Sequence, residues 1–89
     1  MIKMDIKKKA WPELFQKILE GKKNSDIRLA DFNINEGDVL ILEEYDPKTK
    51  EYTGKTIKKK IKNLTKLKLT DFNSFEDIEK YGHWLMEFE

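Results

Sequence analysis

The stretch EGDVLILEEYDPKTKEYTGK, residues 36–55, decides the fold that we expect for this chain. Within it, VLILEEY at 39–45 is an apolar run with β-branched members, which is typical of a central strand buried on both faces. The segment at 46–51 supplies turn chemistry, and Tyr45 and Tyr52 flank it like the two arms of a hairpin. We therefore expect a β-hairpin whose first strand lies inside a sheet.

Further strands are expected on both sides of this hairpin. Residues 52–64 alternate, with Ile57 and Ile61 on one face and lysines on the other. Residues 1–8 alternate in the same way and predict a half-buried strand. In the last predicted strand, at 83–88, the apolar face holds Trp84, Met86 and Phe88.

Two helices are expected. The first follows from an apolar stripe at helical spacing, and we expect the whole stripe to face the core. The stripe consists of Trp11, Leu14, Phe15, Ile18 and Leu19. Pro12 stands in its first turn and Gly21 ends it. A capping box at Ser74 and Asp77 predicts a short second helix that Gly82 stops.

The predicted order is β-α-β-β-β-(β)-α-β, in which the bracketed strand at 66–70 either continues its predecessor or stands alone. Strands dominate, and hairpin-length loops join most neighbours. The sequence therefore predicts one domain over residues 1–89, of the α+β, mainly β class. The architecture that we expect is a small, mostly antiparallel β-barrel with one main helix and a short second helix.

Composition excludes several classes of site. The chain has 89 residues, 39% of them charged, yet its net charge is +1, so total charge does not decide whether it binds nucleic acid. It has no cysteine and a single histidine, His83, which argues against zinc-thiolate and His-rich metal sites. We expect no metal, no cofactor and no membrane partner. We expect a cytoplasmic monomer.

The segment EGKKNSDIRL, at 20–29, has two interpretations. It is a charged helix end in which Asp26 pairs with a lysine or with Arg28, or it is a site for an anionic ligand. Strand alternation places Asn24, Asp26 and Arg28 on one face, with aliphatic residues such as Ile27 opposite. This alternation predicts a polar cleft over the core.

A dense basic run follows the hairpin. Lys58, Lys60 and Lys62 share one strand face, where lysines either guard an edge against aggregation or neutralise phosphates. Tyr52 precedes them, and bases stack on exposed aromatic rings. Both interpretations remain open for this run.

The segments WPELFQKILEGKK (11–23), DIRL (26–29) and GDVLILEEYDPKTKEYTGK (37–55) together resemble the DUF3850 branch of the ASCH-type, PUA-like domains. The resemblance covers roughly residues 5–62. It implies a β-barrel with a cleft beside the main helix. By analogy with PUA domains, it also implies RNA binding.

The ASCH-type signature G-x-K-x-x-E-x-R is matched in this sequence by Gly21, Lys23 and Arg28. At position 26 the signature usually has glutamate, and relatives that hydrolyse acetylated cytidine have threonine. This chain has Asp26 there, and a carboxylate cannot act as a hydroxyl nucleophile. The resemblance therefore implies a ligand cleft and leaves hydrolysis as the alternative.

We predict a binding module for RNA or a nucleotide, and the alternative is a hydrolase that acts on a modified nucleoside or on RNA. If the protein is an enzyme, its candidate catalytic residues are Lys23, Asp26 and Glu43. The predicted ligand-binding residues are Lys22, Lys23, Asn24, Asp26, Arg28, Tyr52, Lys58, Lys60 and Lys62.

Overall fold

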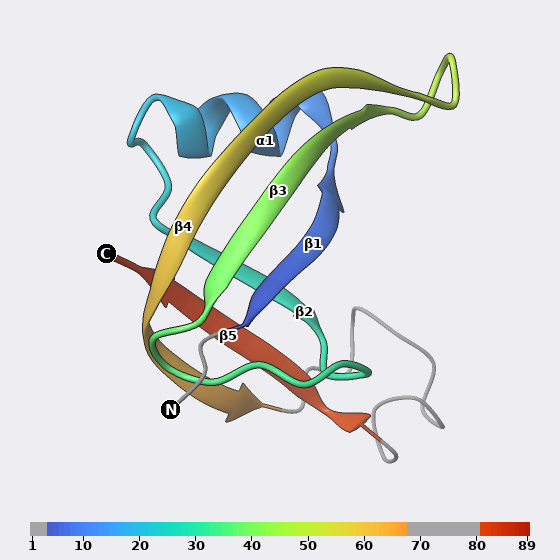
Figure 1. Cartoon of the computed structure of the whole chain (residues 1–89). Helices are drawn as coiled ribbons and strands as arrows, with labels where there is room; N and C mark the ends of the chain where they lie inside the picture. The colour runs from blue at the N-terminus through green and yellow to red at the C-terminus, as the bar shows by residue number, and fades with distance from the viewer. Residues whose placement is uncertain (1–3, 68–80) are drawn as a thin grey trace.

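The computed structural model describes residues 4–67 and 81–89 (Figure 1). These ranges contain one helix, α1 (Pro12–Leu19). The strands are β1 (Asp5–Ala10), β2 (Ser25–Leu29), β3 (Val39–Asp46), β4 (Glu51–Leu67) and β5 (His83–Phe88). The predicted mainly β character is confirmed, and the predicted main helix is present as the short helix α1. The predicted second helix lies outside the described residues.

The strands form one five-stranded sheet in the order β1-β3-β4-β5-β2. The β1–β3 pairing is parallel and the three others are antiparallel. Strand β4 is long and bends, so that Glu51–Lys60 pairs with β3 and Ile61–Leu67 pairs with β5 (Figure 1). The segment VLILEEY is therefore a central strand, as predicted, and the basic run is one continuous strand as far as Leu67.

The two ends of the sheet are β1 and β2. No backbone pairing joins these two edge strands within residues 4–67 and 81–89, so the sheet is curved but open. The predicted closed barrel is therefore not confirmed. The helix α1 lies across one end of the curved sheet (Figure 1) and packs on β3.

The core lies between the curved sheet and α1. Leu40 and Leu42 of β3 are fully buried, because their strand has neighbours on both sides and the helix above. Phe15 and Ile18 are the buried residues of α1. The other members of this core cluster are Ala10, Ile34, Ile61, Met86 and Phe88. The one helix in the described ranges lacks the length and apolarity that a membrane crossing requires.

Trp11 does not belong to the core, so its predicted place in the buried stripe is wrong. Its side chain is 64% exposed. The reason is the short helix: α1 has eight residues, and Trp11 precedes it in an extended conformation, with ψ 153°. Its side chain therefore does not follow the helical phase that brings Phe15 and Ile18 inward. Leu19, at the other end, is also exposed.

Gly21 ends the helix as predicted, through a Schellman motif. Its φ of 77° lies in the left-handed region, which favours glycine. The amide of Gly21 bonds to the carbonyl of Ile18, and the amide of Lys22 bonds to that of Lys17. The amide of Lys23 also bonds to the Lys17 carbonyl, at 3.2 Å. The chain is therefore folded back so that Lys23 lies beside Lys17.

The predicted hairpin is present, with Tyr45 directly opposite Tyr52. Asp46 shapes the turn, because its carboxylate accepts a 2.8 Å hydrogen bond from the amide of Lys48. The register between β3 and β4 shifts just beyond the tyrosines. Gly54 lies in that irregular part of β4 with a φ of 91°, a conformation that glycine adopts without strain.

Candidate functional site

The polar face of β2 points inward. Asp26 is 4% exposed whereas Ile27, its neighbour on the opposite face, is 39% exposed. The alternation predicted from the sequence is therefore present, but the aliphatic side does not cover the core. Arg28 lies on the same inward side as Asp26, two residues along the strand.

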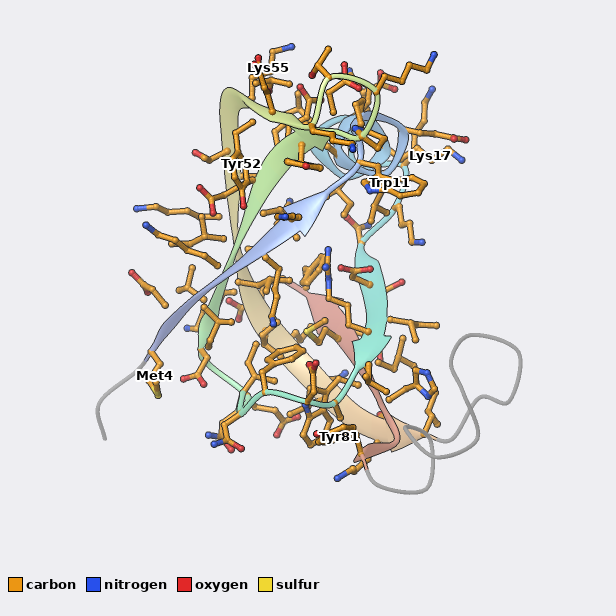
Figure 2. All side chains as sticks on the ribbon, turned by 90° about the vertical axis from the view of Figure 1, so that its right-hand side faces the viewer. Met4, Trp11, Lys17, Tyr52, Lys55 and Tyr81 are labelled. Carbon is orange, nitrogen blue, oxygen red and sulfur yellow. The ribbon has the colours of Figure 1, made fainter. Side chains whose placement is uncertain are left out.

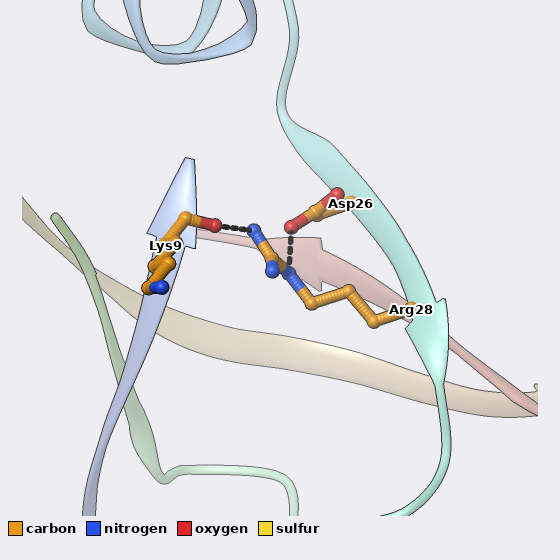
Figure 3. A network of polar contacts seen from close by, with 3 residues as sticks. All are labelled: Lys9, Asp26 and Arg28. Atoms are coloured by element: carbon orange, nitrogen blue, oxygen red, sulfur yellow. Dashed lines mark hydrogen bonds and ion pairs between the residues drawn. The ribbon is translucent and has the colours of Figure 1, made fainter. Parts of the chain in front are cut away.

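Arg28 ties the two edges of the open sheet together (Figure 3). Its Nε donates to Oδ2 of Asp26 at 2.6 Å, and its Nη2 donates to the backbone carbonyl of Lys9 in β1, also at 2.6 Å. The side chain of Arg28 is 21% exposed and that of Asp26 is 6% exposed. Both bonds are charge-assisted, but only the bond to Asp26 is partly buried, where it is stronger than an exposed ion pair; the bond to the Lys9 carbonyl is exposed.

A shallow cleft of about 300 Å³, which we call the strand cleft, lies between β1 and β2 where Arg28 crosses. It is lined by Lys9, Ala10, Trp11, Leu14, Asp26, Ile27 and Arg28. One cation, Arg28, is fixed in it by two hydrogen bonds. The cleft therefore offers a guanidinium of defined orientation, whose charge is balanced by the neighbouring Asp26 carboxylate.

A second cleft of about 240 Å³, the helix cleft, lies beside α1. It is lined by Trp11, Glu13, Leu14, Lys17 and Lys23. Lys17 pairs with Glu13 at 3.5 Å in an exposed geometry, and such pairs are weak. Lys23 has no ion pair within the part of the chain that the structure describes. Its ammonium is therefore the one in this cleft that a ligand can engage most readily.

Trp11 joins the two clefts, because its side chain lines both. Figure 2 shows Trp11, which directly precedes the helix, next to Lys17. An aromatic ring with cations on both sides is an arrangement that suits a nucleotide, since a base stacks on the ring and phosphates meet the cations. The sequence analysis did not include Trp11 among the ligand-binding residues, because a tryptophan in an apolar stripe is expected to be buried in the core. Its place before Pro12, outside the helix proper, was the available signal.

Two of the predicted ligand-binding residues have structural partners elsewhere. Lys22 forms a 2.9 Å ion pair with Glu20. A hydrogen bond from Gln16 and, second, the bond from Lys22 lower the pKa of Glu20. The backbone carbonyl of Asn24 accepts from the amide of Phe88. Neither Lys22 nor Asn24 lines either cleft.

Tyr52, Lys58 and Lys60 lie away from the clefts, on the outer face of β1, β3 and β4. Cross-strand register brings Lys7 and Lys58 to either side of Ile41, and Lys60 opposite Val39. Paired residues share a face, so these side chains lie on one surface. We call this surface the lysine–tyrosine face; it consists of Lys7, Lys9, Tyr45, Tyr52, Lys58 and Lys60. Lys62 is exposed further along β4, at the register shift beside Ile61.

The three candidate catalytic residues do not line one cleft. Lys23 lines the helix cleft, and Asp26 lines the strand cleft, where it holds Arg28. Glu43 lies opposite Thr56 of β4 and Lys9 of β1, on the lysine–tyrosine face. The three groups are therefore spread over two clefts and the outer face of the sheet.

A protein-family model matches most of the chain. The family model described as "Domain of unknown function (DUF3850)" matches residues 6–78 of the chain. This range includes α1, the helix exit, β2, β3 and β4. No curated protein matches the chain.

Proposed function

The chain belongs to the DUF3850 family, and we propose that it is a binding module that holds RNA or a nucleotide in the two clefts joined by Trp11. The observation that carries this proposal is the exposed Trp11 ring, 64% exposed with cations in the clefts on either side. Burying a large apolar side chain stabilises a protein by about 1.5–3 kcal/mol. A small domain that leaves such a ring in solvent has it available for a ligand.

The size of the clefts indicates which part of a nucleic acid each holds. Their volumes, about 240 and about 300 Å³, lie at or below the small end of ligand pockets, which span roughly 300–1,000 Å³. Each cleft therefore suits one base or one phosphate. A strand that crosses Trp11 would place a base on the ring and phosphates on either side.

Arg28 and Lys23 supply the charge for this arrangement. The Nε and Nη2 atoms of Arg28 are engaged by Asp26 and Lys9, and Nη1 makes no hydrogen bond to the described residues. A phosphate oxygen in the strand cleft would accept from Nη1, with Asp26 acting as a positioning residue. Lys23 would act as a point charge in the helix cleft.

The finer fold assignment is part of the same proposal. A curved, open sheet with one helix across an end is consistent with a PUA-like, ASCH-type domain in which Arg28 spans the unpaired edges. The residues that match the ASCH-type signature lie at the helix exit and on the adjoining strand; they are Gly21, Lys23 and Arg28. The proposed binding of RNA or a nucleotide is consistent with a cytoplasmic, monomeric protein. The hydrolase alternative has no comparable support, since its candidate residues are dispersed.

Fluorescence anisotropy with a short labelled single-stranded RNA at low salt tests the proposal. Replacing Trp11 with alanine should weaken binding by about 5- to 150-fold, because stacking on one base contributes about 1–3 kcal/mol. Glu13→Gln should strengthen binding, because it removes the carboxylate that pairs with Lys17 in the helix cleft. Both side chains are exposed, so unfolding curves of the variants should match the parent.

Two outcomes would reject this function. One is that the parent protein does not bind RNA or nucleotides at low salt. The other is that Trp11→Ala binds as well as the parent while remaining folded. A variant of Lys22, whose charge Glu20 already engages, serves as the control and should bind like the parent.

A further inference from the structure

We infer that the lysine–tyrosine face is a second contact surface for the same nucleic acid, so that the ligand is a single-stranded oligonucleotide that passes from the clefts around β1 rather than a mononucleotide. This inference rests on the proposed function. It adds to that function the length of the ligand and the path that it takes.

The first observation is an aromatic pair held ready on this face. The rings of Tyr45 and Tyr52 meet edge to face, with centroids 5.2 Å apart at 69°. Tyr52 is 52% exposed, and its edge-to-face neighbour fixes the ring orientation. An oriented, half-exposed tyrosine offers a stacking surface that accepts any base.

The second observation is the charge around this pair. Lys7, Lys9 and Lys58 make no ion pair within the described ranges, whereas Lys60 pairs loosely with Glu89 at 3.8 Å. Asp5 and Glu43 lie on the same face and reduce the net charge, but the unpaired lysines outnumber them. Residues two apart on a strand are about 6.6 Å apart, so Lys7 and Lys9 form a line of charge along β1. Lined-up cations beside an aromatic ring complement a polyanion that carries bases.

The third observation is that Lys9 belongs to both surfaces. Its backbone carbonyl accepts from Arg28, and it lines the strand cleft. Its Nζ lies 4.3 Å from the centroid of the Tyr45 ring and 5.8 Å from that of Tyr52. In Figure 2, Trp11 and Tyr52 lie on either side of the carboxyl end of β1. A strand that leaves Trp11 and passes over Lys9 therefore reaches Tyr52 by crossing the outer face of β3, where Tyr45 lies between them.

Affinity as a function of RNA length tests this path. The ligands are labelled oligouridines from one to about ten nucleotides, a range that brackets the usual footprint of small single-strand binding domains. In the parent protein, affinity should continue to rise after the shortest RNAs have filled the clefts at Trp11. The double variant Lys7→Gln/Lys58→Gln should bind the shortest RNAs like the parent and the longest ones more weakly. Its slope of log K against log salt should be smaller by about 1.4, which corresponds to two phosphate contacts.

A matched control removes the same charge elsewhere. The double variant Lys22→Gln/Lys48→Gln loses two exposed lysines from the helix end and the hairpin turn, and its salt slope should change by less than half as much. Tyr52→Ala should lower the affinity for long RNAs alone. All of these side chains are exposed, and circular dichroism checks that each variant is folded.

The outcomes separate this inference from the proposed function. If affinity does not rise with length while Trp11→Ala still weakens binding, the second surface is rejected and the clefts remain the site. The same conclusion follows if the Lys7/Lys58 variant and its control show equal salt slopes. If no RNA of any length binds, the proposed function itself is rejected.

Discussion

Arg28 of β2 donates a 2.6 Å hydrogen bond to the backbone carbonyl of Lys9 in β1, and these two strands are the unpaired edges of the sheet. One guanidinium therefore makes a connection that backbone pairing makes between the other neighbouring strands. The same group also neutralises the buried carboxylate of Asp26. The contact between the two edge strands and the fixed hydrogen-bond donor in the strand cleft thus come from a single side chain.

Replacing Arg28 with alanine should destabilise the fold by about 2–4 kcal/mol. Removing one partner of a fully buried ion pair costs about 3–5 kcal/mol, because the other charge is left uncompensated. We expect somewhat less here because the Arg28 side chain is 21% exposed. Urea unfolding with linear extrapolation measures the difference.

A double-mutant cycle separates the pair from its surroundings. The double variant Asp26→Ala/Arg28→Ala should lose clearly less stability than the two single variants lose in sum. Each single variant leaves one charge unpaired, whereas the double variant leaves none. Additive costs would mean that the 2.6 Å contact contributes little to stability. The exposed pair of Lys22 and Glu20 serves as a reference, and its loss should hardly change the unfolding curve.

The sequence predicted the elements well because their signals are local. The hairpin of β3 and β4 and the end of α1 each depend on a few adjacent residues with fixed backbone chemistry. The apolar run at 39–45 required neighbours on both sides, and β3 has them. The curvature of the sheet and its open edges depend on how β4 bends between two partners, which alternation alone does not encode.

The candidate site was predicted in part for the same reason. Alternation placed Asp26 and Arg28 together, and they form the closest ion pair described. The partner of Arg28 across the gap is a backbone carbonyl, that of Lys9, and a carbonyl leaves no mark in a sequence. Trp11 was misassigned because spacing cannot distinguish the last residue before a helix from the first residue within it.

Gly54→Ala should destabilise the protein by about 1–2 kcal/mol through the backbone alone. Gly54 has a φ of 91°, which an alanine adopts only with strain. A Cβ at this position would meet no atom within 4 Å, so no steric clash adds to the cost. Thermal or urea unfolding measures the effect, and an unchanged stability would show that this part of β4 relaxes its register shift. Gly82→Ala is a harsher comparison, because its Cβ would lie 2.9 Å from the carbonyl oxygen of Leu67.

The pKa of Glu20 should rise towards its ordinary value of 4.5 in Gln16→Ala, and also in Lys22→Gln. The hydrogen bond from Gln16 is the larger cause of the lowered pKa and the bond from Lys22 the second, so the first variant should give the larger rise. Because the folded-state pKa is lowered, this carboxylate contributes to stability above its unfolded pKa. That contribution is lost as the pH falls through the lowered pKa. A carbon-detected NMR titration follows Glu20 directly, and equal pKa values in all three proteins would contradict the contacts at the helix end.

Lys9→Met should separate the structural use of Lys9 from its use in binding. The hydrogen bond to Arg28 involves the backbone carbonyl of Lys9, so it survives the substitution. Loss of the cation over the Tyr45 ring should cost about 0.5–1 kcal/mol at this exposed position, as measured by urea unfolding. Binding to a long RNA should weaken, and the salt slope should fall by about 0.7, because one phosphate contact is lost next to both the clefts and the lysine–tyrosine face. A large loss of stability would mean that the ammonium and not the carbonyl holds the edge of β1. Unchanged binding with an intact fold would remove Lys9 from the path of the strand.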